Sequence, residues 1–239
     1  DYFQATRGGG HGDYRTIVLA PATVQELTTI VPLAFSLADK YRNPVIILSD
    51  GVLGQMMEPV DFDDLVPPPD YEKSWALTGA RGRPAQDIHS LIFDTKLHEE
   101  HNWKLQRKFR LIEQNEVRYE TYLADDAEMV VVAYGTGARI AKGAIKRLRD
   151  EGKKVGLLRP VTVWPFPAPA LNELAKTVDD FFVFEMSAGQ MVEDVRLALE
   201  GKGRIHFYGR PGGVAPMPVE LYRIISRHYL QTQSERGER

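Results

Sequence analysis

Short apolar runs alternate with amphipathic stretches through the second half of the chain. Each run is four or five residues long, and a stretch with apolar residues at helical spacing follows it. A short apolar run, a turn and an amphipathic helix form the repeating unit of an open α/β sheet. Four such repeats predict a doubly wound parallel sheet. The strands are expected at 129–133, 155–158, 181–185 and 204–208, the helices at 139–151, 169–177, 191–199 and 218–230, and a frayed polar end at 231–239.

The first half shows a single strand–helix–strand pattern over residues 14–58. Thr23 and Glu26 have the spacing of a capping box at the start of a helix. Pro32 lies inside this helix and should kink it or mark a break. The run Val45–Leu48 is apolar throughout, which is typical of a parallel strand buried on both faces. One βαβ unit of this size is too small to fold alone.

A connector separates these two parts. Residues 59–96 are rich in proline and show no sustained period, so we expect irregular structure there. The stretch Leu97–Val117 is charged, and Leu105, Phe109 and Ile112 fall on one helical face together with Glu116. We therefore expect an amphipathic helix that bridges the two halves. The resulting division is 1–65, 66–118 and 119–239.

Composition excludes several classes of function. The 239 residues are 43% hydrophobic and 26% charged, with a net charge of -3, as in an ordinary globular protein. Nothing in this balance points to nucleic-acid or membrane binding, and no apolar run has the length of about 20 residues that a spanning helix needs. The chain has no cysteine, so it can hold no disulfide, iron–sulfur cluster or cysteine nucleophile.

We expect a cytoplasmic protein. Because the chain begins with Asp1 and lacks a leader, we also expect it to be cut from something longer.

The best-formed motif is Gly135-Thr136-Gly137, between an apolar run and an amphipathic helix. A helix start of this kind offers free backbone N–H groups to an anion. A dinucleotide-binding fingerprint would also need glycine or alanine at position 140, where the chain has Ile140, and an acidic residue about 20 positions later. The next strand ends in Arg159 and Pro160. We therefore interpret the motif as a strand-to-helix turn, with anion or interface contact as its candidate role.

Candidate chemistry lies in loops at the ends of the predicted strands. His11 lies in the glycine loop Arg7–Asp13 and could act as acid, base or anion contact, or simply be a surface residue. Asp50 and Gln55 follow a strand and could reach a ligand crevice; Asp50 could equally cap a helix. No cluster has metal-ligand spacing, and His98 and His101 are expected to be solvated.

Arg210 follows the last predicted strand and is flanked by a glycine and a proline. Its guanidinium could bind a carboxylate or phosphate, or could hold an interface. Glu185 could pair with Arg210 or with the turn at Gly189. On the residues alone, no self-sufficient catalytic group is found.

The motifs together resemble the α subunit of 2-oxoacid:ferredoxin oxidoreductases, over nearly the whole chain. Within that family the triple glycine before His11 and the run Glu113–Tyr119 look most like the branched-chain form, which acts on 3-methyl-2-oxobutanoate (2-ketoisovalerate). The 2-oxoglutarate form is the nearest alternative. The stretches that carry the resemblance are Gln4–Tyr14, Val18–Pro21, Val24–Glu26, Leu48–Gly51, Leu53–Glu58, Glu113–Tyr119, Gly156–Pro160 and Gly209–Gly213.

The resemblance implies oxidative decarboxylation of a 2-oxoacid with thiamine diphosphate, transfer of the acyl group to coenzyme A and reduction of ferredoxin. It implies a C-terminal half of a pyrimidine-binding-type domain in residues 1–65 and a transketolase-C-terminal-like, doubly wound sheet in 119–239. A β subunit would hold the diphosphate and Mg²⁺, and iron–sulfur clusters would lie on other chains, with γ and ferredoxin-like δ subunits completing the complex.

The family's catalytic motifs would lie upstream of Asp1, so we expect the isolated segment to be inactive. From the family we transfer only the expectation that two stretches of this chain lie near the active-site crevice. The candidate residues are Arg7, Gly10, His11 and Asp13 in the first stretch, and Asp50, Gln55 and Met56 in the second. A non-catalytic assembly module, which docks other chains through the proline-rich connector and the last sheet, remains the alternative. Binding of NAD or ATP by a separate nucleotide-binding protein is not expected.

Overall fold

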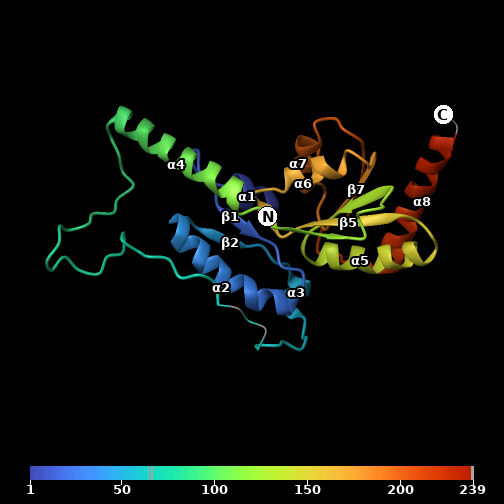
Figure 1. The fold of residues 1–239 in the computed structure, drawn as a ribbon, viewed down its shortest axis with the longest axis horizontal. Coiled ribbons are helices and arrows are strands. Elements are labelled where there is room, and N and C mark those ends of the chain that lie inside the picture. The colour runs from blue at the N-terminus through green and yellow to red at the C-terminus, as the bar shows by residue number, and fades with distance from the viewer. Residues whose placement is uncertain (64, 66, 238–239) are drawn as a thin grey trace.

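The computed structural model describes residues 1–63, 65 and 67–237 and contains two sheets (Figure 1). The smaller sheet has the order β2-β1-β6 and the larger one the order β3-β5-β4-β7-β8. The strands are β1 (Ile17–Leu19), β2 (Val45–Ile47), β3 (Tyr119–Tyr122), β4 (Met129–Val132), β5 (Val155–Pro160), β6 (Thr162–Trp164), β7 (Asp180–Glu185) and β8 (Arg204–Gly209). The helices are α1 (Tyr2–Arg7), α2 (Val24–Tyr41), α3 (Gly51–Gln55), α4 (Thr95–Asn115), α5 (Gly135–Asp150), α6 (Ala168–Leu174), α7 (Met191–Leu199) and α8 (Pro218–Gly237).

The larger sheet confirms the four predicted parallel strands. β5, β4, β7 and β8 pair in parallel, and apolar residues fill both faces because alternate side chains point to opposite sides. Val131 packs on the side of α5 and α8, whereas Val130 and Val132 belong to the other cluster, with residues of α6 and α7. Figure 1 shows these helices on the two sides of the sheet. The sheet is therefore doubly wound around β4 and β7.

Two strands were missed, and both pair antiparallel. β3 adds an edge to the larger sheet against β5, so this sheet is mixed and not wholly parallel. β6 crosses from the second half of the chain into the smaller sheet and pairs with β1. The predicted βαβ unit of β1, α2 and β2 is thus completed by residues 162–164. The domain division at residues 65 and 118 stays a prediction.

Three further expectations were wrong in part. The residues of β2 are only half-buried, because β2 is an edge strand of the smaller sheet. α2 runs from residue 24 to 41 without a break at Pro32. α8 continues to Gly237 instead of fraying after residue 230, because Thr232 is buried and Glu235 pairs with Arg204 of β8.

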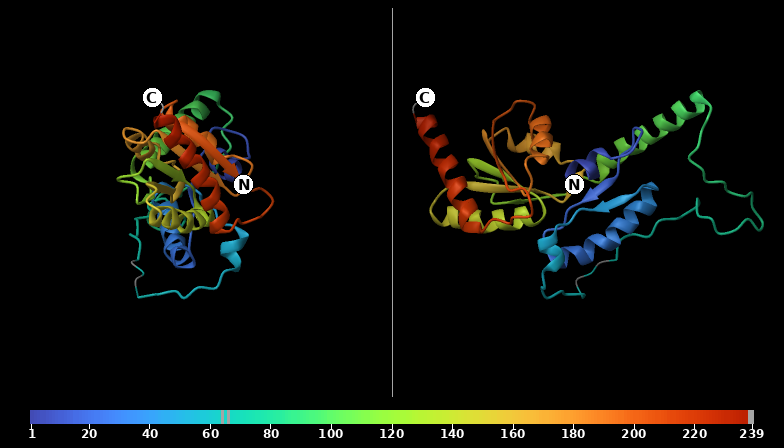
Figure 2. Two further views of the ribbon diagram at one scale, coloured as in Figure 1. Left: turned by 90° about the vertical axis from the view of Figure 1, so that its right-hand side faces the viewer. Right: turned by 180° about the vertical axis from the view of Figure 1, so that it is seen from behind.

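The connector and the bridging helix extend away from the two sheets. Between Met56 and Asp94, the described residues form neither helix nor strand, as the sequence predicted. Asp94 begins α4 by accepting the N–H groups of Lys96 and Leu97. Phe109 and Ile112 anchor the C-terminal half of α4 in the core, while the other end projects outward (Figures 1 and 2). Within the described residues, no helix combines the length and apolar character needed to cross a membrane.

Glu116 fixes the end of α4 to the first half of the chain. Its side chain is only 3% exposed, and its Oε1 accepts bonds from Lys40 Nζ at 2.7 Å and Tyr41 Oη at 2.6 Å. Arg118 Nη1 lies 2.8 Å from its Oε2. Burial by itself would raise the pKa of Glu116, but bonds from Lys40, Tyr41 and Arg118 hold it below its ordinary value of 4.5.

Replacing Glu116 by glutamine should cost about 2 kcal/mol of stability at neutral pH, because charge-assisted bonds are lost from a buried group. Because the pKa of Glu116 is lower in the folded protein than in the unfolded one, its ionised carboxylate stabilises the fold at pH values above the unfolded pKa. This stabilisation is lost as the pH falls through the pKa of the folded protein. The difference in free energy of unfolding between wild type and Glu116→Gln should therefore narrow below pH 4.5. Denaturant titrations at neutral and acid pH measure it. Glu100→Gln, at an exposed position of α4, is the control; an equal loss in both variants would contradict the prediction.

Candidate functional site

The carboxyl ends of three parallel strands and a glycine loop after a fourth enclose a cavity of about 720 Å³. β2 belongs to the smaller sheet, whereas β4 and β7 belong to the larger one, so the cavity lies where the two sheets meet. Open α/β sheets bind ligands outside the carboxyl ends of their strands. The lining residues are Asp1, Leu48, Ser49, Asp50, Gly51, Val52, Gln55, Tyr134, Gly135, Gly137, Glu185, Met186, Gly212 and Gly213.

Asp50 joins the two sides of this cavity. Its Oδ1 accepts the N–H groups of Val52 and Leu53, both at 3.0 Å, and so caps α3. Its Oδ2 lies 3.9 Å from the point where a Cβ on Gly135 would stand. The sequence left open whether Asp50 caps a helix or reaches a ligand crevice; in the structure it caps α3 and lines this cavity. Gln55 also lines the cavity, whereas Met56, half-buried just after α3, does not.

Gly135, Thr136 and Gly137 form the first turn of α5 and not a separate turn before it. The N-cap residue, Tyr134, makes no side-chain cap bond, and the first N–H groups of a helix have no partner within it. Gly135 and Gly137 face the cavity, so this turn offers N–H donors there. The Thr136 side chain is buried, and its Oγ1 has no hydrogen-bond partner among the described residues.

The two glycines of this turn should respond differently to alanine. Gly135 has φ +54°, a conformation that costs an L-residue about 1–2 kcal/mol. Gly137 has ordinary φ, and a Cβ there would make normal contact with the Phe184 ring at 3.4 Å. Gly135→Ala should therefore lower stability by about 1 kcal/mol, whereas Gly137→Ala should be neutral or stabilising because alanine favours helix. Thermal unfolding compares the two; equal effects would contradict the assignment of strain to Gly135.

Tyr134 is a cavity residue with a polar side chain that sequence reasoning missed. Its side chain is half-buried, and its hydroxyl group titrates well above the ordinary tyrosine range. Burial is the main cause of this raised pKa, followed by the negative charges of Glu185 and Asp50. The hydroxyl therefore stays protonated and can donate a hydrogen bond at neutral pH. Its position directly before Gly135, at the end of β4, was the available signal.

Glu185 holds the other wall of the cavity. The carboxylate is 1% exposed and accepts the N–H groups of Gln190, Met191 and Val192, together with the Ser187 hydroxyl. It thus pairs with the turn around Gly189, one of its two predicted partners, and begins α7.

Arg210 does not pair with the Glu185 side chain. Its guanidinium contacts Glu220 and donates to the Tyr208 hydroxyl at 3.1 Å. Only its backbone N–H reaches Glu185, by donating to the carbonyl oxygen at 3.0 Å. Arg210 therefore joins β8 to the start of α8. Its two predicted roles, anion binding or an interface, stay predictions; in the structure Nη1 of the guanidinium is engaged by Tyr208 and Glu220.

The glycine loop does not line this cavity. Arg7 pairs with Asp194 of α7 through its two terminal guanidinium nitrogens, at 2.9 and 3.2 Å, and stacks on Phe3. The N–H of Gly10 donates to the Tyr14 hydroxyl, and His11 is exposed. Arg7 thereby fixes α1 to α7, a role that requires a partner 187 positions away. The structure brings Asp50, Gln55, Gly135 and Gly137 together, but not the residues of this loop.

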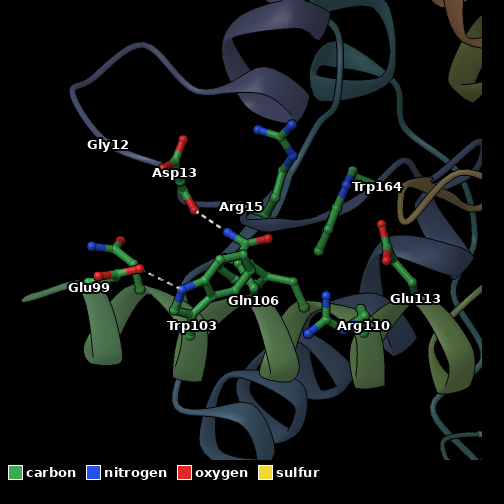
Figure 3. A pocket seen from close by; sticks show the side chains of 11 residues that line it. Gly12, Asp13, Arg15, Glu99, Trp103, Gln106, Arg110, Glu113 and Trp164 are labelled. Carbon is green, nitrogen blue, oxygen red and sulfur yellow. Dashed lines mark hydrogen bonds between the residues drawn. The ribbon is translucent and has the colours of Figure 1, made fainter.

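Asp13 instead lines a second cavity of about 640 Å³, between the glycine loop and α4. Its backbone oxygen accepts a hydrogen bond from Gln106 at 2.9 Å, and Figure 3 shows this bond bridging the cavity. The two cavities have no lining residue in common.

Comparison with known families follows the division between the two halves. Residues 1–125 match the thiamine-diphosphate-binding model of the pyruvate flavodoxin/ferredoxin oxidoreductases, and residues 127–221 match core domain II of pyruvate:ferredoxin oxidoreductase. The chain belongs to the 2-oxoacid:ferredoxin oxidoreductase family, which confirms the resemblance in its motifs. The predicted α/β fold class is confirmed as well.

Among individual relatives, the ketoisovalerate oxidoreductase subunit VorB of Methanothermobacter marburgensis is 49% identical over 213 residues, which cover 89% of this chain and 60% of VorB. The 2-oxoglutarate synthase subunit KorA of Methanocaldococcus jannaschii is 32% identical over 250 residues, covering 92% of this chain and 65% of KorA. The chain thus spans about three fifths of the length of the VorB relatives.

A solved 2-oxoglutarate:ferredoxin oxidoreductase from Magnetococcus marinus has the same fold, with a TM-score of 0.76 over 95% of this chain and 44% of that one. At 22% identity this likeness shows the fold alone.

Proposed function

We propose that this chain is part of the α-type subunit of a heteromeric 2-oxoacid:ferredoxin oxidoreductase that acts on a branched-chain 2-oxoacid. The reaction is oxidative decarboxylation to an acyl-CoA with reduction of ferredoxin. The observation that carries the proposal is the identity of 49% to ketoisovalerate oxidoreductase subunits, against 30–34% to four 2-oxoglutarate synthase subunits.

The cavity where the sheets meet supports a role near the cofactor. Asp50, Tyr134 and the first turn of α5 supply a carboxylate, a protonated hydroxyl and free N–H groups, which can orient a polar heterocycle such as an aminopyrimidine. Its charged lining residues, the chain terminus aside, are carboxylates. The cavity therefore fits the pyrimidine end of thiamine diphosphate better than the diphosphate.

We accordingly assign the diphosphate and Mg²⁺ to a β subunit, and iron–sulfur clusters to the γ and δ subunits or ferredoxin. A cytoplasmic location and inactivity of the isolated chain belong to the same proposal.

The test is an assay of the complex assembled from the full-length α subunit and its partner subunits. With thiamine diphosphate and coenzyme A present, 3-methyl-2-oxobutanoate should reduce ferredoxin with a kcat/KM at least about tenfold above that for 2-oxoglutarate, a preference of about 1.4 kcal/mol. A reversed preference would replace the branched-chain assignment by the 2-oxoglutarate form. Loss of the coenzyme A requirement would reject the reaction. Turnover by the 239-residue chain alone would reject the division of labour between subunits.

A non-catalytic assembly role is favoured by one specific observation. The connector and its continuation into α4 expose large apolar side chains, with Phe93 at 87%, Leu91 at 67% and Leu97 at 58%. Exposed apolar residues clustered in this way mark protein interfaces. Co-purification of partner subunits with the chain, but not with a Leu91→Ser, Phe93→Ser, Leu97→Ser variant, would support this role. Retention of the partners by that variant would reject it.

A further inference from the structure

The cavity between the glycine loop and α4 carries charges of both signs that do not neutralise one another. Arg110 makes no side-chain hydrogen bond or ion pair among the described residues, and the same holds for Glu113. Both line the cavity, one helical turn apart on α4. Residues three apart on a helix are neighbours that can pair directly, yet this Arg–Glu pair stays open. Figure 3 shows both side chains beside Trp164.

The rest of the lining includes three aromatic side chains, of which Phe109 and Trp164 are buried and Trp103 is exposed. Trp164 packs edge-to-face against Phe109 at the cavity, with ring centroids 6.0 Å apart. Trp103 is 53% exposed, and its indole N–H donates to Glu99 at 3.3 Å, which engages that carboxylate. The exposed ring of Trp103 therefore offers an apolar surface at the cavity. The volume of about 640 Å³ is that of small-molecule sites.

The charges define which molecules this surface would accept. The described lining holds two guanidinium groups, of Arg15 and Arg110, and three carboxylates, of Asp13, Glu99 and Glu113. A simple anion would meet an excess of negative charge, and a simple cation would leave Arg110 without a partner, whereas Arg15 already donates to the Tyr14 carbonyl oxygen at 3.2 Å. A molecule with adjacent carboxylate and ammonium groups can satisfy Arg110 and Glu113 together, because those two side chains are themselves adjacent.

We propose that this cavity is a binding site for a zwitterion with a large apolar side chain, the class of the branched-chain and aromatic α-amino acids. Arg110 binds the carboxylate, Glu113 binds the ammonium group, and Trp103 and Trp164 contact the side chain. The site has no lining residue in common with the cavity at the strand ends, so it does not depend on the function proposed for that cavity.

Three matched ligands test the charge requirement on the full chain by calorimetry, with quenching of tryptophan fluorescence as the second signal. L-Phenylalanine carries both charges, 3-phenylpropionate lacks the ammonium group and 2-phenylethylamine lacks the carboxylate. Each single-charge ligand should bind about tenfold or more weakly than L-phenylalanine, since a hydrogen bond to a charged group is lost. Equal binding of all three, or no saturable binding of L-phenylalanine at its solubility limit, would overturn the proposal.

Three variants then assign the partners. Arg110→Gln should weaken L-phenylalanine and 3-phenylpropionate about tenfold and leave 2-phenylethylamine unchanged. Glu113→Gln should weaken L-phenylalanine and 2-phenylethylamine and leave 3-phenylpropionate unchanged. Arg107→Gln is the matched control, because Arg107 is exposed on the same helix but does not line the cavity. All three positions are at the surface, so circular dichroism should show unchanged folding. If Arg107→Gln and Arg110→Gln had the same effect, the assignment would be wrong.

Discussion

Replacing Arg159 by methionine is expected to lower the free energy of unfolding by about 3 kcal/mol, the range seen when one member of a buried ion pair is removed. The side chain of Arg159 is 2% exposed, and its two terminal nitrogens bond both carboxylate oxygens of Glu26, at 2.7 and 2.9 Å. Its Nε donates to Glu120 at 3.1 Å. The loss leaves Glu26, only 20% exposed, without its counter-ion.

This ion pair connects the two sheets. Arg159 lies on β5 of the larger sheet, whereas Glu26 lies on α2, which packs on the smaller one. Glu26 also accepts the N–H of Ala22 at 2.7 Å, while its own N–H donates to Thr23 Oγ1 at 3.0 Å. The predicted capping box is therefore present in modified form. The Glu26 carboxylate accepts the backbone N–H of Ala22 and not that of the N-cap residue Thr23, and it also binds Arg159. Loss of Arg159 should loosen the junction at which the cavity lies.

Lys142→Met provides the control for Arg159. Lys142 also bonds Glu120, at 3.0 Å, but its side chain is 42% exposed. Exposed ion pairs contribute about 1 kcal/mol or less. Denaturant unfolding of both variants should separate them by about 2 kcal/mol. If Arg159→Met were no less stable than Lys142→Met, the buried pair would not be what joins the sheets.

The local pattern of apolar residues correctly predicted those helices and strands that carry a clear apolar run or an apolar helical face in their own sequence. The apolar run that forms β4 and the helix Met191–Leu199 were found with nearly the observed bounds. β6 was missed because it has three residues and forms only by pairing with β1, about 145 positions earlier, as in Val18 against Trp164. β3 was missed because its residues are mostly exposed and follow no apolar alternation.

The same limit applies to the candidate site. Asp50 was found because it lies three residues after the end of β2, a position that local pattern reveals. Arg7 was expected close to the active-site crevice, but it pairs with Asp194, which a distant helix contributes. Tyr134 was missed because its raised pKa depends on burial and on the nearby charges of Glu185 and Asp50. These residues come together only in the tertiary structure, where the two sheets are in contact. Sequence therefore locates strand-end residues, whereas their partners require the tertiary fold.

Replacing Glu185 by alanine is the second change with a large expected effect, also about 3 kcal/mol. The carboxylate accepts the N–H of Met191 at 2.8 Å and that of Val192 at 2.9 Å, and both bonds are buried. Removing a helix cap costs about 0.5–2 kcal/mol, and a buried donor left without a partner adds about 1–3 kcal/mol. Glu185→Gln keeps one acceptor oxygen and should lose roughly half as much.

Glu193 gives the matched comparison, because it lies in the first turn of the same helix but its side chain is 53% exposed. Its replacement by alanine should remove the favourable interaction of a surface charge with the helix dipole and a long, exposed ion pair with Arg7 at 4.0 Å, each of which contributes about 1 kcal/mol or less. Chemical denaturation should therefore rank wild type, Glu193→Ala, Glu185→Gln and Glu185→Ala in falling stability.

Glu185 also raises the pKa of Tyr134 through its negative charge. Glu185→Gln should therefore lower the pKa of Tyr134 towards the ordinary tyrosine value, measurable by ultraviolet titration. An unchanged Tyr134 titration would place Glu185 in the helix cap alone and separate it from the chemistry of the cavity.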